Sequence, residues 1–257
     1  MVSLAANMEW LFTEAGVETA ARVRAAGRHG FRDVELWGWR EKDLPAVRDA
    51  AREAGVRILS VIVDPQLQLT DRGSHEAYLA AVAESVRAAD VLGSPNLVVV
   101  AGQGRDGVSR EDQRAAVVSV LREAAALVPD HLTLLLENLN DRVDHPGTFL
   151  TSTIEALDII DEVGSPRLKL LLDAYHALVM GEDPVDLVGA RMSSVGHVQI
   201  ADVPGRHEPG TGTVDWPELL RSFVAAGYAG PFGLEYMPSG STEQSLREIE
   251  RIAAEIS

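Results

Sequence analysis

The 257-residue sequence contains no cysteine, and this absence excludes disulfides, thiolate metal sites and cysteine nucleophiles. Aromatic residues make up only 5% of the chain, and lysine occurs only at positions 42 and 169. No stretch approaches the roughly 18 consecutive apolar residues that a membrane-spanning helix needs. The N-terminal residues have neither the basic start nor the apolar segment of a signal peptide. We therefore expect a cytoplasmic protein without a membrane partner.

Positive charge is also scarce. The chain has 23 lysines and arginines against 39 acidic residues, which gives a formal net charge of -16. Nucleic-acid binding requires clustered cations that neutralise phosphates, so we expect no nucleic-acid partner. A small anionic substrate is compatible with this charge, because a metal and a few local cations reverse the field inside a cleft.

Short strand-like runs alternate with longer helical patterns along the whole chain, and 46% of the residues are hydrophobic. The candidate strands are Leu4–Asn7, Val34–Trp37, Arg57–Val63, Leu97–Val100, Leu132–Glu137, Leu168–Asp173, Gly196–Ile200 and Phe232–Glu235. The candidate helices are Val17–Gly27, Leu44–Ala54, His75–Leu92, Arg110–Val128, Phe149–Val163, Pro184–Arg191, Trp216–Ala226 and Thr242–Ile256.

Regular alternation of this kind predicts a parallel sheet with right-handed crossovers. Eight units in this length favour closure into a single (β/α)₈ TIM barrel, with residues 1–257 forming one α/β domain. An open dinucleotide-binding sheet would need a glycine-rich phosphate loop after an early strand. The only similar run, Gly102-Gln103-Gly104, follows the fourth strand and does not open a helix, so no nucleotide cofactor is predicted.

Four consecutive candidate strands each carry an oxygen-bearing side chain at or near the C-terminal end: Glu137, Asp173, Gln199 and Glu235. The C-terminal ends of barrel strands meet at one rim, so we expect these side chains to converge. Three carboxylates and an amide oxygen predict a site for one divalent cation, Mg²⁺ or Mn²⁺. The alternative is that these acids cap neighbouring helices or pair with arginines.

Two basic side chains are predicted to face a substrate at the same rim. His176 lies three residues past Asp173, in a predicted loop, where it could donate to a substrate oxygen. Arg206 lies in the loop after the seventh strand, and its guanidinium could hold a substrate carboxylate through two hydrogen bonds. The alternative for Arg206 is an ion pair with Asp202 or Glu208.

Other rim residues are weaker candidates. Trp37 and Trp39 follow Glu35 at the second strand and could form a pocket wall or a contact in a homo-oligomer. Gln103, after the fourth strand, is a further candidate for the substrate pocket. Asn140 is predicted to fix a turn rather than to contact substrate.

Four segments together resemble the hydroxypyruvate isomerase family of xylose isomerase-like barrels: ENLN at 137–140, LLLDAYH at 170–176, GHVQIADVPGRHEPGTG at 196–212 and GLEY at 233–236. The resemblance implies a metal site made by the four strand-end residues, in which Glu137 and Glu235 also act as the acid/base pair. It further implies that His176 and Arg206 face substrate. The segment DPQLQLTD at 64–71 departs from the Gly-Asp-Trp type of stretch associated with hydroxypyruvate isomerases, which leaves the substrate open.

The predicted function is that of a metal-dependent aldose–ketose isomerase. Its substrate would be hydroxypyruvate, tartronate semialdehyde or a related 2-oxo sugar acid, and proton transfer would pass through an enediolate. A ketose 3-epimerase with the same metal site is the nearest alternative. A hydride shift would require a lysine near the substrate, but Lys169 lies within a strand and not at its end, so proton transfer is favoured. A metal-dependent nuclease would require more than the seven histidines present and a basic surface, so the sequence disfavours that function.

Overall fold

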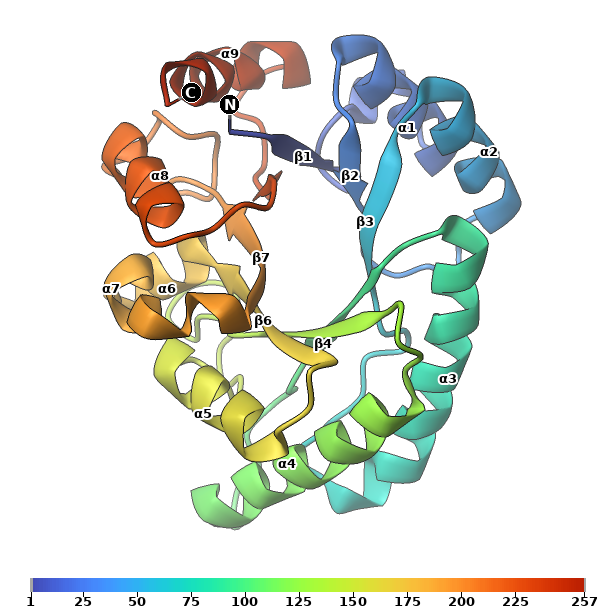
Figure 1. The fold of residues 1–257 in the computed structure, drawn as a ribbon, viewed down its shortest axis with the longest axis vertical. Coiled ribbons are helices and arrows are strands. Elements are labelled where there is room, and N and C mark those ends of the chain that lie inside the picture. Colours follow the sequence, from blue (N-terminus) through green and yellow to red (C-terminus); the bar gives the residue numbers. More distant parts are fainter. Residues whose placement is uncertain (1, 257) are drawn as a thin grey trace.

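In a computed structural model, which describes residues 2–256, eight parallel strands close into a barrel in sequence order, with β1 paired to β8 (Figure 1). This confirms the predicted (β/α)₈ barrel, and every predicted strand is present within about two residues of its expected bounds. The strands are β1 (Leu4–Asn7), β2 (Asp33–Glu35), β3 (Arg57–Ile62), β4 (Asn96–Val100), β5 (Thr133–Glu137), β6 (Leu168–Asp173), β7 (Val195–Ile200) and β8 (Phe232–Leu234).

The helices form an outer ring around the strands (Figure 1). None of the helices described is long and apolar enough to cross a membrane. The α-helices are α1 (Thr19–His29), α2 (Leu44–Ala54), α3 (His75–Leu92), α4 (Arg110–Leu127), α5 (Thr153–Val163), α6 (Ala174–Met180), α7 (Pro184–Val188), α8 (Trp216–Ala225) and α9 (Thr242–Glu255). Three short 3₁₀ segments are η1 (Thr13–Ala15), η2 (Arg72–Ser74) and η3 (Gly189–Ser194).

The prediction of a loop after the sixth strand was wrong, because α6 begins there at once. The side chain of Asp173 accepts a hydrogen bond from the backbone N–H of Tyr175 at 2.8 Å and so caps the helix. His176 is therefore a helical residue. With seven residues, α6 is too short for its apolar periodicity to be recognised in the sequence.

Two other helices differ from their predicted bounds. Helix α5 begins at Thr153 instead of Phe149, because the side chain of Ser152 accepts from the backbone of Glu155 and sets the N-cap. The predicted helix Pro184–Arg191 is divided into α7 and the 3₁₀ segment η3, and Gly189 lies at the break with a φ of 46°.

The alternation of side chains along β5 and β6 determines that their last polar side chains face the inside of the barrel. Val98, Leu135 and Leu171 form an apolar cluster separate from the larger core between sheet and helices. Side chains two residues apart on a strand share a face, so Glu137 and Asp173 face the same way as Leu135 and Leu171. Their strand-end positions place both carboxylates above that cluster, at the C-terminal end of the barrel.

Helices α1 and α2 approach each other closely at Gly27, where a Cβ atom would lie 2.6 Å from Ala54 Cβ and 3.1 Å from Val56 Cγ2. Gly27→Val should therefore lower the free energy of unfolding by about 1–3 kcal/mol through overpacking. Arg28→Val on the exposed side of the same helix should change it by less than about 0.5 kcal/mol. Urea unfolding measures both, and equal stability of the two variants would contradict this packing.

Candidate active site and metal centre

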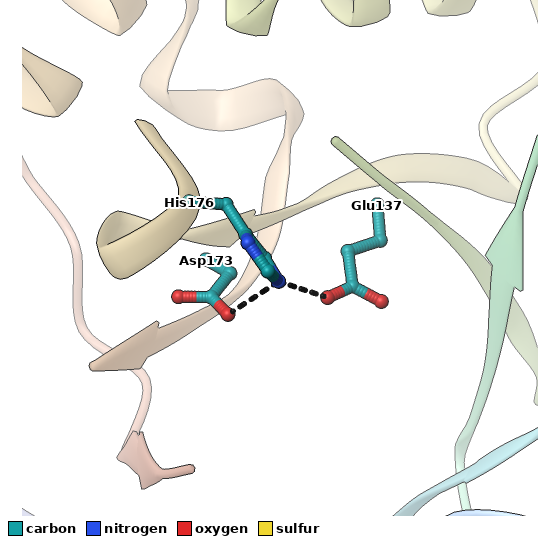
Figure 2. A group of neighbouring side chains, drawn as sticks. All are labelled: Glu137, Asp173 and His176. Carbon is teal, nitrogen blue, oxygen red and sulfur yellow. Dashed lines mark ion pairs between the residues drawn. The ribbon is translucent and has the colours of Figure 1, made fainter. Parts of the chain in front are cut away.

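Three buried side chains gather where β5 and β6 end. Ligand-type atoms of Glu137, Asp173 and His176 all lie within 4.8 Å of one another. Figure 2 shows the imidazole of His176 between the two carboxylates. His176 Nε2 lies 3.3 Å from Asp173 Oδ2 and 3.9 Å from Glu137 Oε1. A helix that starts at the strand end thus brings a nitrogen into a group of acids.

Glu235 and Gln199 join this cluster through shared hydrogen bonds. Arg206 Nη2 donates to Glu235 Oε2 at 2.7 Å and to Asp173 Oδ2 at 3.3 Å, so one guanidinium nitrogen bridges the two acids. Gln199 Nε2 donates to Glu235 Oε1 at 3.3 Å. The four residues predicted as metal ligands therefore lie together at one end of the barrel. Glu235 lies one residue past the end of β8.

The three carboxylates are buried, and they outnumber the cations that pair with them. Burial, and then repulsion from Glu235 and Asp173, raise the pKa of Glu137 well above its usual value. Burial raises the pKa of Glu235 to about 7, against the lowering effect of Arg206, and burial also raises the pKa of Asp173. In the part of the chain that the structure describes, Arg206 is the one arginine or lysine that forms an ion pair with them. Three ionised carboxylates and one guanidinium leave an excess of two negative charges.

One oxygen of the site has no hydrogen-bond partner. Gln199 Oε1 is buried and unpaired among the residues described, whereas Gln199 Nε2 donates to Glu35 Oε2 at 2.9 Å as well as to Glu235. A buried carbonyl oxygen without a partner costs about 1–3 kcal/mol unless something binds it. Three carboxylates and one free amide oxygen form the oxygen-rich set that Mg²⁺ or Mn²⁺ prefers, so the residues fit the predicted cation.

Arg206 is held over the site by its surroundings. It has a φ of 56°, unusual for a residue with a side chain, and its guanidinium lies 5.0 Å from the ring centre of Trp10 and 4.8 Å from that of Tyr175. The alternative of an ion pair with Asp202 or Glu208 was wrong. Both of those carboxylates instead accept hydrogen bonds from backbone N–H groups of nearby loops.

The cluster opens into a cavity of about 680 Å³. Six of the predicted site residues line it, whereas Asp173 and Gln199 lie buried behind this lining. The six are Trp37, Gln103, Glu137, His176, Arg206 and Glu235. Trp37 Nε1 donates to Glu235 Oε1 at 2.7 Å, and Gln103 is exposed at the cavity mouth.

The two tryptophans that could have formed an oligomer contact both have partners within the chain. The indole of Trp37 bonds Glu235, as described above. Trp39 Nε1 donates to Ser85 Oγ at 3.0 Å, and the guanidinium of Arg40 lies 4.7 Å from the centre of its ring. Both tryptophans are half-buried.

Comparison with known proteins was consistent with this geometry. Residues 23–254 match the xylose isomerase-like TIM barrel family. The chain is 36% identical to a putative hydroxypyruvate isomerase of Homo sapiens, over 94% of this chain and 91% of that protein. It is 33% identical to the hydroxypyruvate isomerase of Escherichia coli K12, over 96% of this chain and 98% of that protein.

The chain belongs to the hydroxypyruvate isomerase family of xylose isomerase-like barrels. This isomerase is also 27% identical to a 2-oxo-tetronate isomerase of Pectobacterium atrosepticum, with 96% of each chain covered. A crystal structure from Brucella melitensis, described as AP endonuclease family 2, has a TM-score of 0.90 and 29% identity, covering 98% of this chain and 99% of that one.

Sequence reasoning missed two residues of the isomerase site, Asn7 and Trp10. Asn7 ends β1 and its Nδ2 donates to Glu235 Oε1 at 3.3 Å. Trp10 follows in the next turn, lies against Trp37 with ring centres 5.0 Å apart, and lines the cavity. The rule that the site gathers at the ends of the strands would have found both, if it had been applied to the first strand as well.

Asn140 does more in this isomerase than fix its turn. Its Oδ1 accepts from the backbone N–H groups of Val143 and Asp144, as a turn residue should. Its Nδ2 donates to His176 Nδ1 at 2.6 Å, and its backbone N–H lies 3.3 Å from the same atom. Because Nδ1 of His176 accepts, the proton of the neutral ring belongs on Nε2, the atom that faces Asp173 and Glu137.

We predict that nitrogen NMR of the metal-free isomerase will show His176 as the neutral Nε2–H tautomer at pH 7. Burial, then the charges of Arg206 and His145, lower the pKa of His176 well below its usual value, so the ring should not be charged. Long-range proton–nitrogen correlation reports which nitrogen carries the proton, and His176→Gln assigns the signals by removing them. A protonated Nδ1 in the wild-type protein would contradict this assignment.

The raised pKa of Glu235 predicts a pH-dependent stability of the metal-free isomerase. In the folded state the Glu235 carboxyl keeps its proton up to about pH 7, whereas in the unfolded chain the same carboxyl releases its proton near pH 4.5. The stabilisation from this group is therefore complete below pH 4.5 and lost as the pH rises towards and through 7. Thermal unfolding of the chelated protein should show a steeper loss of stability between pH 5 and 8 than Glu235→Gln does. Parallel profiles for the two proteins would contradict this assignment.

Proposed function

We propose that this isomerase interconverts the ketone and aldehyde forms of a small hydroxy-keto acid, hydroxypyruvate and tartronate semialdehyde or a related 2-oxo sugar acid, with one bound Mg²⁺ or Mn²⁺. The observation that carries the proposal is the group of three buried carboxylates, Glu137, Asp173 and Glu235, with one unpaired amide oxygen beside them at the strand ends. The names of the relatives, hydroxypyruvate isomerase and 2-oxo-tetronate isomerase, support this class of substrate.

In this proposal Glu137, Asp173, Gln199 and Glu235 hold the cation. Their oxygens suit a hard divalent ion, and two positive charges offset the excess negative charge that Arg206 leaves uncompensated. A cation bound there would polarise the substrate carbonyl and stabilise negative charge on its oxygen. His176 is not among the ligands, because its Nε2 carries the proton and has no lone pair to give.

Glu137 and Glu235 move the proton. They come from β5 and from the end of β8, and both line the cavity, so a substrate can lie between them. One carboxylate removes the proton from the hydroxyl-bearing carbon next to the carbonyl, and the resulting enediolate takes a proton on the former carbonyl carbon, while the hydroxyl proton passes from one oxygen to the other. The carbonyl thereby moves by one carbon, with no net gain or loss of electrons. Each positioned group of this kind contributes roughly 10²–10⁴-fold to the rate.

Arg206 and His176 orient the substrate. Arg206 Nε is buried and unpaired among the residues described, so the guanidinium retains a donor for a substrate carboxylate. His176 Nε2 also lacks a well-formed hydrogen bond and is placed to donate to a substrate oxygen. Trp10 and Trp37 form an apolar wall beside them, which excludes water from the reacting atoms.

A ketose 3-epimerase is the second candidate, and the far side of the cavity favours it. Gln66, Gln68 and Gln103 line that side, and neutral amides suit the hydroxyl groups of a longer sugar. The cavity of about 680 Å³ is also larger than a three-carbon acid needs. Epimerisation would use the same two glutamates, with the proton returned to the opposite face of the same carbon.

Glu137→Gln and Glu235→Gln should each lower kcat by at least about 10²-fold, because an amide neither removes nor delivers the proton. The measurement is turnover of hydroxypyruvate and of a panel of 2-oxo sugar acids and ketoses, with far-UV circular dichroism to show that each variant folds. Glu123→Gln, on the exposed surface of α4, is the matched control and should keep full activity.

Turnover in D₂O separates proton transfer from a hydride shift. Proton transfer places solvent deuterium on the carbon of the product that receives the proton. Complete retention of the substrate hydrogen, or near-normal kcat in either glutamine variant, would contradict the roles given to Glu137 and Glu235. The substrate panel decides between the hydroxy-keto acid and the ketose.

A further inference from the structure

A buried carboxylate that the proposed mechanism does not use lies inside the barrel. Glu35, the last residue of β2, is only 1% exposed. One of its oxygens accepts a hydrogen bond from His197 Nε2, and the other accepts from Gln199 Nε2 at 2.9 Å. Both donors are inward-facing residues of β7, so Glu35 connects β2 to β7 across the interior of the barrel.

The fold makes room for this carboxylate at Gly233. Gly233 lies on β8 and pairs in register with Gln199. A Cβ atom at Gly233 would lie 2.8 Å from both Cδ and Oε2 of Glu35, and closer still to its Oε1. Real Cβ atoms essentially never come this close to another atom, so the missing side chain of β8 leaves the volume that Glu35 fills.

The position of Glu35 decides which way the carboxamide of Gln199 faces. Its Nε2 donates to Glu35 at 2.9 Å and to Glu235 at 3.3 Å, which engages both amide protons. In the opposite orientation the amide oxygen would face two carboxylates, and like partial charges would repel it. Gln199 Oε1 is consequently the buried atom without a partner.

We propose that Glu35 is a positioning residue that orients the Gln199 carboxamide so that its oxygen, and not its nitrogen, is presented to the cation. This inference rests on the proposed function, in which Gln199 is a metal ligand. Glu35 is absent from the cavity lining and does not touch substrate. Groups that orient a metal ligand typically account for a 10–100-fold effect on metal affinity.

His197 fixes the far side of Glu35. Its Nδ1 lies 3.4 Å from the hydroxyl of Tyr228, and that hydroxyl donates to the carbonyl oxygen of Pro231 at 2.7 Å. The same hydroxyl accepts from the backbone N–H of Val198 at 3.1 Å. The Tyr228 hydroxyl, itself held by the backbone of Pro231 and Val198, therefore lies against the side of the His197 ring opposite Glu35.

The test is the Mn²⁺ affinity of the metal-free protein, measured from the electron paramagnetic resonance signal of free Mn²⁺. Glu35→Gln should weaken binding by about 10–100-fold. Gly233→Ala should act in the same direction, because its methyl group displaces the carboxylate without changing its charge.

Asp33→Asn is the control on the same strand, since Asp33 is buried and pairs with Arg57 at 2.8 Å, and it should leave the affinity unchanged. Thermal unfolding shows whether each variant is folded. If Glu35→Gln does not fold, the affinity of Gly233→Ala alone decides the test.

A double-mutant cycle shows whether Glu35 acts through Gln199. Gln199→Ala should weaken Mn²⁺ binding by itself, and adding Glu35→Gln to it should cause little further loss. Unchanged affinity in Glu35→Gln and Gly233→Ala, or a full additional loss in the Gln199→Ala background, overturns the positioning role and leaves the proposed function standing. A wild-type protein that binds no Mn²⁺, or a Gln199→Ala variant that binds it normally, overturns the proposed ligand set and this inference with it.

Discussion

Three buried carboxylates lie together at the C-terminal rim of the barrel, and their mutual repulsion must be compensated. Arg206 supplies one positive charge from a loop, through a single nitrogen that bridges Asp173 and Glu235. Burial raises the pKa of all three acids, and repulsion from neighbouring carboxylates adds to the effect. The proposed divalent cation would compensate this repulsion and let all three acids stay ionised, and proton abstraction requires an ionised carboxylate.

The surrounding hydrogen bonds fix the role of each polar group by deciding where its protons lie. Asn140 donates to His176 Nδ1, which keeps the Nε2 proton pointed at the acids. Glu35 and Glu235 each accept from the amide nitrogen of Gln199, which leaves the amide oxygen free. In the proposed site the two residues therefore have opposite roles: His176 donates to the substrate, and Gln199 offers an oxygen to the cation. Neither role is determined by the type of residue alone, because each depends on a partner from a distant part of the chain.

The sequence predicted the barrel and the strand-end residues because both follow from local patterns. Apolar runs that end in a polar residue, such as Leu134 to Glu137, indicate strand and rim together. It missed α6 because a seven-residue helix capped by a site residue has no periodicity of its own. It gave Glu35 little weight and missed Trp10 because their importance comes from contacts across the barrel, to Gln199 and Arg206, which no local pattern shows. Arg206 was placed in the right loop with the wrong alternative partners, because its guanidinium pairs with Asp173 and Glu235, which lie far away in the sequence.

The central claim is that one divalent cation on Glu137, Asp173, Gln199 and Glu235 is required for isomerisation. The most direct measurement is activity and metal content before and after thorough chelation, followed by addition of Mg²⁺ or Mn²⁺. We expect one ion per chain, loss of turnover when the ion is removed, and recovery when it is returned. Full turnover by protein shown to contain no metal would contradict it.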